Sequence, residues 1–462
     1  MGRAFTILAG IVLATFVVLV MRLHSGESRL SAVAEPERAL ALLVGRTMDV
    51  ETALTAAPAW ERRLYALTLS DPGRELDQAI TWYEELSDYS LAPSVDLRLA
   101  ILRGEAGRHE PLERALGQWT ARGEPLATYA DVLAAAYLDA DDVEADAVED
   151  AAGTLGPGWF ADMLALRLAA RFDEPALAAT ARQSIVARAG PLLWRLRALT
   201  LVDLALLAGG ILALIALRRR SPEARMAATA PLPPPWPLGA GVAALVRGGA
   251  LSAIALLLVL SGNQWLAERP AVAEALDAPI MYVPVVLLAW RMLLAPAGAS
   301  FAGVFGLWPR RGGWRPLLLA AMTLVGAGVV LDAGLALGGG WLQLDSHWAE
   351  WFDSDLAWGP LGAVVVTLVA TVVLAPVFEE IIFRGLLYGS LRTRFGVAPS
   401  ILVSALIFAL AHGYGAAGFA SVFCSGALWA WSYERTRSVL PAIAAHMANN
   451  ASVGLTLLWL LR

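Results

Sequence analysis

Long apolar runs recur along this chain and decide its fold class. About 20 apolar residues in a helix cross the hydrocarbon core of a bilayer. Lipid cannot hydrogen-bond an exposed backbone, so spanning segments are expected to be helical. We therefore predict an all-α, polytopic membrane bundle. The expected spans are residues 4–21, 199–217, 241–262, 278–296, 315–337, 359–390, 398–415, 416–433 and 438–461.

Residues 26–190 differ in kind, because they are polar and their apolar residues recur at helical spacing, as at Leu99 and Leu102. Residues 24–188 hold 28 acidic residues against 15 arginines, a charge near −13. We predict a soluble all-helical domain here. A plain helical bundle and an array of tetratricopeptide-type repeats both fit, since no fixed period is visible.

The first apolar run has two interpretations. A secretory signal peptide would end at a small-x-small site, and Ala32-Val33-Ala34 offers one. That site lies well beyond the end of the apolar run, so we favour an uncleaved transmembrane anchor over residues 1–22.

Arginine clusters beside the spans set the expected orientation, because cytoplasmic loops are enriched in basic residues. With the N-terminus inside, the acidic domain and the Trp-rich segment 341–358 fall outside the cytoplasm. We expect a multi-pass protein of the inner membrane with an extracytoplasmic helical domain. A stiff, Pro-rich linker at 221–238 then leads to a membrane domain over 240–462. The cytoplasmic clusters are Arg218–Arg220 with Arg225, Arg310, Arg311 and Arg315, Arg392 and Arg394, and Arg435 and Arg437.

Composition supports a membrane protein, with 58% hydrophobic and 16% charged residues. The formal net charge of −6 gives no hint of a nucleic-acid partner. The single cysteine, Cys424, excludes an intrachain disulfide. Inside an apolar run it is best interpreted as a small packing residue.

Charged side chains inside the span at 359–390 need a reason, because an ionisable group in a bilayer is costly. Glu380 and Arg384 are four residues apart, share one helix face and can pair. Glu379 points roughly 100° away on a helix of 3.6 residues per turn, which leaves it available as a general base. Pro376 should kink or break the helix just before them. A purely structural ion pair fits the same residues.

Two histidines follow in later apolar segments. His412 comes four residues after Phe408, and His446 lies one helical turn before Asn450 on the same face. Two His, one Glu and one Asn suffice to activate a water and to stabilise an oxyanion. Taken singly, each intramembrane His could equally link or pack helices. Their ordered occurrence within apolar helices favours catalysis.

The three motifs together resemble those of the CPBP family, the CAAX proteases and bacteriocin-processing enzymes also called the Abi family. The segment Phe305–Arg311 is also similar to a cytoplasmic loop of that family. The resemblance covers residues 240–462 and leaves residues 1–220 without a counterpart. The motifs are Glu379-Glu380-x-x-x-Arg384, Phe408-x-x-x-His412 and His446-x-x-x-Asn450.

The resemblance implies a helical bundle with a cavity open toward one side, and a role for each motif residue. Glu379 and His412 would activate the attacking water. His446 and Asn450 would stabilise the tetrahedral oxyanion. The supporting residues would be Glu380, Arg384 and Phe408.

The reaction could depend on zinc or proceed without a metal. The family is often described as metalloproteases, and two His with one Glu form a legitimate zinc set, here Glu379, His412 and His446. The alternative is glutamate-dependent chemistry without a metal. The sequence has no H-E-x-x-H motif and gives no independent support for zinc. We favour the glutamate-dependent reaction and keep zinc as the alternative.

The depth of the two activating residues poses a difficulty. Strict alternation of straight spans puts Glu379 toward the inner half of the membrane and His412 toward the outer half. Both must reach one water, so at least one segment should be broken, tilted or re-entrant. Pro376 and Gly413-Tyr414-Gly415 are the expected places.

The leading hypothesis is an intramembrane endopeptidase that hydrolyses a membrane-associated peptide or protein. A non-catalytic scaffold or immunity protein could hold a partner in the same pocket. A proton-coupled carrier could use Glu379 and the two His as a relay, although no inverted repeat is visible. The acidic helical domain suggests recruitment of a protein partner outside the cytoplasm. Nothing in the sequence implies a prenylated substrate.

Overall fold

The computed structural model describes residues 2–26, 29–68, 72–140, 143–220, 230–260, 270–309, 314–342 and 346–462. These residues form helices and turns and no strand, which confirms the all-α fold class. Two apolar helices at Ala278–Leu294 and Val397–His412 are shorter than a full span. Among these described residues, five helices are long and apolar enough to cross a membrane, which fits a multi-pass protein: α1 (Gly2–Gly26), α10 (Pro175–Arg218), α12 (Leu238–Leu260), α16 (Arg315–Leu342) and the helix at Leu361–Leu391.

Contacts divide the chain into two compact units. The membrane unit comprises Met1–Gly26 and Thr200–Leu458. The helical unit comprises Glu27–Leu199 and Trp459–Arg462. Helix α10 contributes its first part to the helical unit and its second part to the membrane unit.

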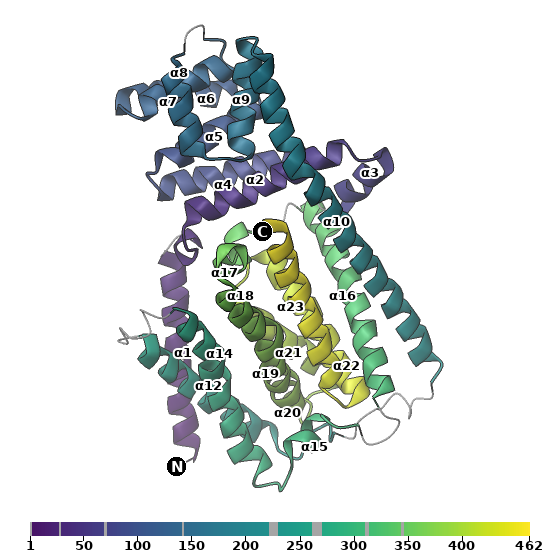
Figure 1. The fold of residues 1–462 in the computed structure, drawn as a ribbon. Helices are drawn as coiled ribbons and strands as arrows, with labels where there is room; N and C mark the ends of the chain where they lie inside the picture. Colours follow the sequence, from purple (N-terminus) through teal and green to yellow (C-terminus); the bar gives the residue numbers. More distant parts are fainter. Residues whose placement is uncertain are drawn as a thin grey trace. The chain divides into compact units, whose positions relative to one another are not determined.

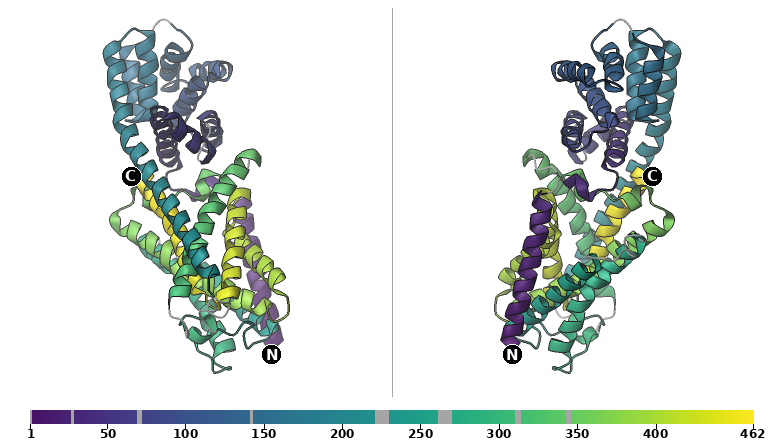
Figure 2. Two further views of the ribbon diagram at one scale, coloured as in Figure 1. Left: turned by 90° about the vertical axis from the view of Figure 1, so that its right-hand side faces the viewer. Right: turned by 90° about the vertical axis from the view of Figure 1, so that its left-hand side faces the viewer.

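Short helices build the helical unit, which Figure 2 shows from two sides. From α4 to α9, consecutive helices pack together, and alternate helices such as α5 with α7 also touch, as in stacked helical hairpins. Before α10, its helices are a 3₁₀ turn at Arg29–Ala32, α2 (Pro36–Thr55), α3 (Ala59–Thr68), α4 (Pro72–Tyr89), α5 (Pro93–Glu105), α6 (His109–Arg122), α7 (Leu126–Tyr137), α8 (Ala145–Leu155) and α9 (Trp159–Arg171).

Charged pairs hold α10 against the other helices of the helical unit. Arg188 donates to both oxygens of Asp49 on α2 at 2.9 and 3.1 Å, and it lies 2.6 Å from Asp162 on α9. Arg197 donates two hydrogen bonds to Glu61 on α3, at 2.6 and 2.8 Å. Asp49 and Glu61 are buried, so these pairs help to fix the helices that carry them.

In the membrane unit, the other helices pack around one long central helix, Leu361–Leu391 (Figure 1). Helix α1 packs along α12, where Arg247 donates to Thr6 Oγ1 at 2.8 Å and to the carbonyl of Gly2. The remaining elements of this unit are α14 (Pro270–Ala289) with a π-helical turn at Trp290–Leu294, α15 (Phe301–Phe305), a 3₁₀ turn at Trp348–Glu350, α17 (Ser354–Trp358), α18 (Leu361–Leu368), α19 (Ala375–Glu379), α20 (Gly389–Leu391), α21 (Val397–His412), α22 (Ala416–Thr436) and α23 (Leu440–Leu461).

The central helix changes pitch where the sequence suggested a kink. Helices α18, α19 and α20 are joined by π-helical stretches at Val369–Leu374 and Glu380–Tyr388. Pro376 follows the first stretch and has no N–H to donate, so the regular hydrogen-bond ladder cannot pass through it. The helix nevertheless continues from Leu361 to Leu391. The expected break is therefore a local widening rather than an end of the helix.

Helix α21 is short. Its 16 residues measure about 24 Å, less than the roughly 30 Å of a bilayer core. It ends at His412 because Gly413 adopts the left-handed conformation, with φ 67°, and α22 begins at Ala416. The interruption expected at Gly413-Tyr414-Gly415 is present.

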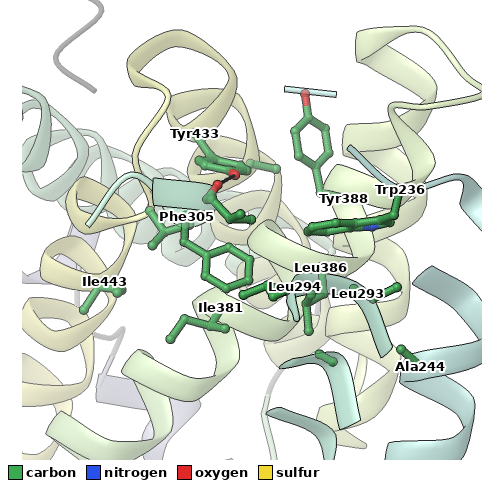
Figure 3. Close-up of a cluster of buried hydrophobic side chains, with 14 residues drawn as sticks. Trp236, Ala244, Leu293, Leu294, Phe305, Ile381, Leu386, Tyr388, Tyr433 and Ile443 are labelled. Carbon is green, nitrogen blue, oxygen red and sulfur yellow. Dashed lines mark hydrogen bonds between the residues drawn. The ribbon is translucent and has the colours of Figure 1, made fainter. Parts of the chain in front are cut away.

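A buried apolar cluster joins the helix ends on one side of the central helix (Figure 3). Phe305, at the end of α15, is fully buried there. The next residue, Gly306, has φ 64°, and a Cβ at this position would lie 2.1 Å from the carbonyl oxygen of Arg437. Only glycine permits this approach to the start of α23. Arg310 and Arg311, in the loop that follows, lie outside the described residues.

The Pro-rich segment differs from a free spacer where it is described. Trp236 belongs to the same apolar cluster, and its indole N–H donates to Ser390 Oγ at 3.0 Å. Residues 221–229 lie outside the described residues. A buried tryptophan needs a partner for its N–H, and Ser390 supplies one next to the central helix.

Candidate active site

Two carboxylates lie where the central helix is widest. Glu379 ends α19, and Glu380 opens the π-helical stretch. Helices α12, α21 and α22 all contact this stretch. Glu379 is 9% exposed and Glu380 is fully buried. π-Helical segments are rare in proteins and frequent at functional sites, because the wider turn re-aims side chains.

Glu380 orients both an arginine and a histidine. Its Oε1 accepts a hydrogen bond from Arg384 Nη1 at 2.8 Å, so the predicted pair is present. The same oxygen lies 3.0 Å from His446 Nδ1 on α23. An ionised carboxylate can only accept, which assigns a proton to His446 Nδ1. Arg384 is also fully buried, so each charge depends on the other.

The Glu379 carboxylate has two different neighbours. Its Oε1 accepts a hydrogen bond from the Tyr282 hydroxyl on α14 at 2.5 Å. Its Oε2 lies 3.8 Å from His446 Nε2. That separation is too long for a direct hydrogen bond, but a water bound to both atoms can bridge it. Glu379 is thus held at one oxygen and open to a small polar molecule at the other.

Aromatic rings enclose the charged groups. The Trp429 ring on α22 stacks on His446, with centroids 4.2 Å apart and planes 24° apart. Arg384 Cζ lies 4.1 Å from the centroid of Phe408 and 5.1 Å from that of Trp429. Ring faces attract cations, which stabilises a guanidinium that water cannot reach. Phe408, which the motif places before His412, therefore supports Arg384.

The His412 ring is held by its own helix. Its Nδ1 lies 2.8 Å from the carbonyl oxygen of Phe408, and a carbonyl only accepts, so Nδ1 carries the hydrogen. In the neutral ring Nε2 is then unprotonated. The ring also packs edge-on against Phe408 at 4.6 Å and lies 5.6 Å from the ring of Tyr414.

The short α21 removes the difficulty with depth. A brief turn joins Leu391, where the central helix ends, to Val397, where α21 begins. Counted along the helices from that turn, Glu379 lies about 18 Å and His412 about 22 Å away, at 1.5 Å per residue. The two residues are therefore expected at similar depth.

Asn450 bonds to the backbone of the central helix. Its Nδ2 donates to the carbonyl oxygen of Thr371 at 2.9 Å, and its Oδ1 accepts from Asn449 at 3.4 Å. Thr371 lies in the π-helical stretch that precedes Glu379. An amide nitrogen carries two hydrogens, so one N–H remains beyond the bond to Thr371.

The structure connects the predicted residues to different degrees. Within the described part of the chain, neither His412 nor Asn450 bonds directly to the Glu379 carboxylate. His412 is joined through Phe408, and Asn450 through Thr371. Hydrogen bonds join Glu380 to Arg384 and His446, and Phe408 and Glu379 lie against this group.

The residues do not fit a three-ligand zinc site. Among the described residues, no group of three or more His, Cys, Asp and Glu side chains is placed to hold a metal ion. The set considered above, Glu379, His412 and His446, is therefore not assembled.

Several residues near the site do not belong to the sequence motifs. Tyr282 and Trp429 lie in apolar spans where an aromatic residue is ordinary. In the Trp-rich segment, Trp348 is fully buried. Both oxygens of Glu350 accept from the backbone N–H of Gly415 at 3.2 Å, which caps α22 beside the His412 turn. His347 is half-buried, and its Nδ1 accepts from the N–H of Ala349.

Comparisons with known proteins point to the same segment. Residues 361–452 match the family described as "Type II CAAX prenyl endopeptidase Rce1-like". The chain is 30% identical over 98 residues to "Putative membrane peptidase YdiL" of Bacillus subtilis (strain 168), a match that covers 20% of this chain and 37% of that protein. No solved structure matches the chain. The matched residues 361–452 contain all three motifs, which confirms for this part of the membrane unit the predicted resemblance to CPBP-family intramembrane proteases.

Proposed function

We propose that this membrane protein is an endopeptidase that hydrolyses peptide bonds within or beside the bilayer. The observation that carries the proposal is the Glu379 carboxylate. It is nearly buried, held at one oxygen by Tyr282, and 3.8 Å from His446 at the other. The matches to proteins named as peptidases, over the residues that hold this site, support it.

Glu379 would act as the general base. It would remove a proton from a water while the water oxygen attacks the scissile carbonyl carbon. His412 would hold the same water through Nε2. The proton on Glu379 would then pass to the leaving amine as the C–N bond breaks. One water is consumed, and the carboxylate is restored.

His446 and Asn450 would stabilise the oxyanion. Asn450 has one N–H beyond its bond to Thr371. His446 would donate from Nε2 when both of its ring nitrogens carry hydrogens. Donors aimed at a developing charge in a dry site are worth more than in water, which suits a site enclosed by helices.

The proposal extends to the substrate and to the location of the protein in the cell. A site at membrane depth favours a membrane-associated peptide or protein as substrate. The arginine clusters favour the inner membrane, with the helical unit outside the cytoplasm. There the helical unit would recruit substrate or a protein partner. Deleting residues 26–190 without changing activity or co-purifying partners would contradict that role.

Comparing wild type with Glu379→Ala in cell membranes tests the function. Membrane and secreted peptides are quantified by mass spectrometry at matched protein level. Peptides that vanish with Glu379→Ala establish the peptidase and name its substrates. Identical peptides from both, with a partner that co-purifies with both, would instead favour the non-catalytic scaffold or immunity protein.

A further inference from the structure

Tyr282 is a polar neighbour of the site that lies outside both the motifs and the matched segment 361–452. It belongs to α14, and its hydroxyl donates to Glu379 Oε1 at 2.5 Å. Its ring stacks on Phe378, with centroids 5.5 Å apart and planes 12° apart. The hydroxyl and the ring therefore contact adjacent residues of the central helix.

The stack fixes where the hydroxyl can be. Helix α14 contacts α18, α19 and the π-helical stretches before and after Glu379, so its backbone is anchored along this part of the central helix. A ring packed face to face on Phe378 has little freedom about its own bonds. The hydroxyl is thus presented to Glu379 at one position, as a short hydrogen bond to a charged acceptor requires.

The carboxylate needs such a partner. The terminal torsion of a glutamate is broad and roughly two-fold, so an unrestrained carboxylate samples many orientations. A bond to Oε1 removes that freedom and turns Oε2 toward His446 Nε2, 3.8 Å away. Small errors in the placement of a catalytic group are costly, because the reacting atoms must be close and aligned.

We propose that Tyr282 is a positioning residue of the peptidase reaction. It holds the Glu379 carboxylate so that Oε2, rather than Oε1, receives the proton of the attacking water. The inference rests on the proposed function. It extends the site from the matched segment to α14.

The chain supplies a matched control. Tyr388 donates to Glu434 Oε2, also at 2.5 Å, but Glu434 belongs to an arginine network away from the site. Tyr282→Phe and Tyr388→Phe each delete one hydroxyl bonded to one carboxylate. A purely structural role predicts similar effects of the two changes. A positioning role predicts an effect on turnover from Tyr282→Phe alone.

The test measures kcat and KM for the full chain in detergent or liposomes. The probe is a synthetic copy of a membrane peptide that requires Glu379 for its cleavage. Tyr282→Phe should lower kcat about tenfold with KM unchanged, since one hydrogen bond to a charged group is lost. Tyr388→Phe should keep the wild-type kcat. Phe378→Leu, which loosens the ring but keeps the hydroxyl, should fall in between.

Equal kcat for Tyr282→Phe and wild type would overturn the inference, as would equal losses in the two Phe variants. Glu379→Gln on the same peptide separates this failure from failure of the proposed function. An inactive Glu379→Gln with a fully active Tyr282→Phe refutes only the positioning role. If Glu379→Gln still cleaves, the proposed role of Glu379 as the base and the role of Tyr282 fall together.

Discussion

Two glutamates of the membrane unit share one kind of bond and differ in the rest. Glu379 accepts from Tyr282, and Glu434 on α22 accepts from Tyr388, both at 2.5 Å. Glu434 also accepts from Arg392 at 3.0 and 3.2 Å. At Glu379, the second oxygen faces His446 across 3.8 Å instead.

This difference between the two carboxylates distinguishes a structural role for Glu434 from a chemical role for Glu379. A carboxylate whose oxygens are filled by guanidinium and hydroxyl donors stays charged and fixed, so it can only join helices. Glu434 is also 3.5 Å from Arg437, which completes such a network between the central helix and the end of α22. A carboxylate with one unfilled oxygen beside a histidine can take up a proton. Glu379 has that arrangement. Its neighbour Glu380 is the carboxylate that pairs with Arg384.

The largest expected effect concerns the two arginines. Arg384→Met leaves Glu380 buried without its arginine and with only the bond from His446, which should destabilise the protein by about 3–5 kcal/mol. Arg392→Met should cost less, because Glu434 is partly exposed and keeps Tyr388 and Arg437. Denaturant unfolding of both variants in micelles measures the difference. Equal losses of stability would remove the distinction between the two networks.

Trp429 tests whether the rings around Arg384 and His446 matter for turnover. Trp429→Leu removes the ring stacked on His446 and should slow cleavage by about ten- to hundredfold, since a misplaced catalytic group is costly. Trp431→Leu is the matched control, because that ring is exposed on the same helix and lies beside Arg435. A similar loss of rate in both variants would count against a specific role for the stack.

The smallest effect extends the comparison to the helical unit. Hydrogen bonds from Arg197 lower the pKa of Glu61, so this pair behaves like the filled Glu434 network. A lowered pKa means that the pair stabilises the fold fully above the usual glutamate pKa, near 4.5, and that this contribution is lost on further acidification. The difference in Tm between wild type and Glu61→Gln should therefore narrow below that pH.

The exposed pair of Glu110 and Arg114, 3.7 Å apart, provides the control. Glu110→Gln should change Tm little at any pH, because exposed pairs contribute little. A Tm difference for Glu61→Gln that stays constant from neutral pH down to strongly acidic pH would contradict the assigned role of Arg197.

The sequence predicted the fold class and the Glu380–Arg384 pair because both follow from short-range rules. Apolar length predicts spans, and a four-residue spacing predicts a shared helix face. It also located the interruption after His412, since Gly413 and Gly415 mark a turn. What it missed depends on pitch and packing. A π-helix has no simple residue signature, so Pro376 suggested a break where the helix widens.

Partners contributed by distant helices were also beyond the sequence. Tyr282 reaches Glu379 from 97 positions away, and Glu350 reaches Gly415 from 65 positions away. Nothing in the local pattern of either residue indicates its partner. The bond of Asn450 to Thr371, rather than to a motif residue, likewise arises from the packing of α23 on the central helix. The orientation in the membrane and the role of the helical unit stay predictions.

The most direct measurement compares Glu379→Gln with Glu434→Gln in one membrane cleavage assay, with unfolding followed in parallel. Both changes replace one carboxylate by an amide of the same shape. Glu379→Gln should slow cleavage at least about 100-fold, the usual contribution of a general base, at unchanged stability. Glu434→Gln should cleave at nearly the wild-type rate and unfold more readily. Wild-type cleavage by Glu379→Gln, or equal loss of cleavage in both variants, would contradict the assignment of Glu379 as the base.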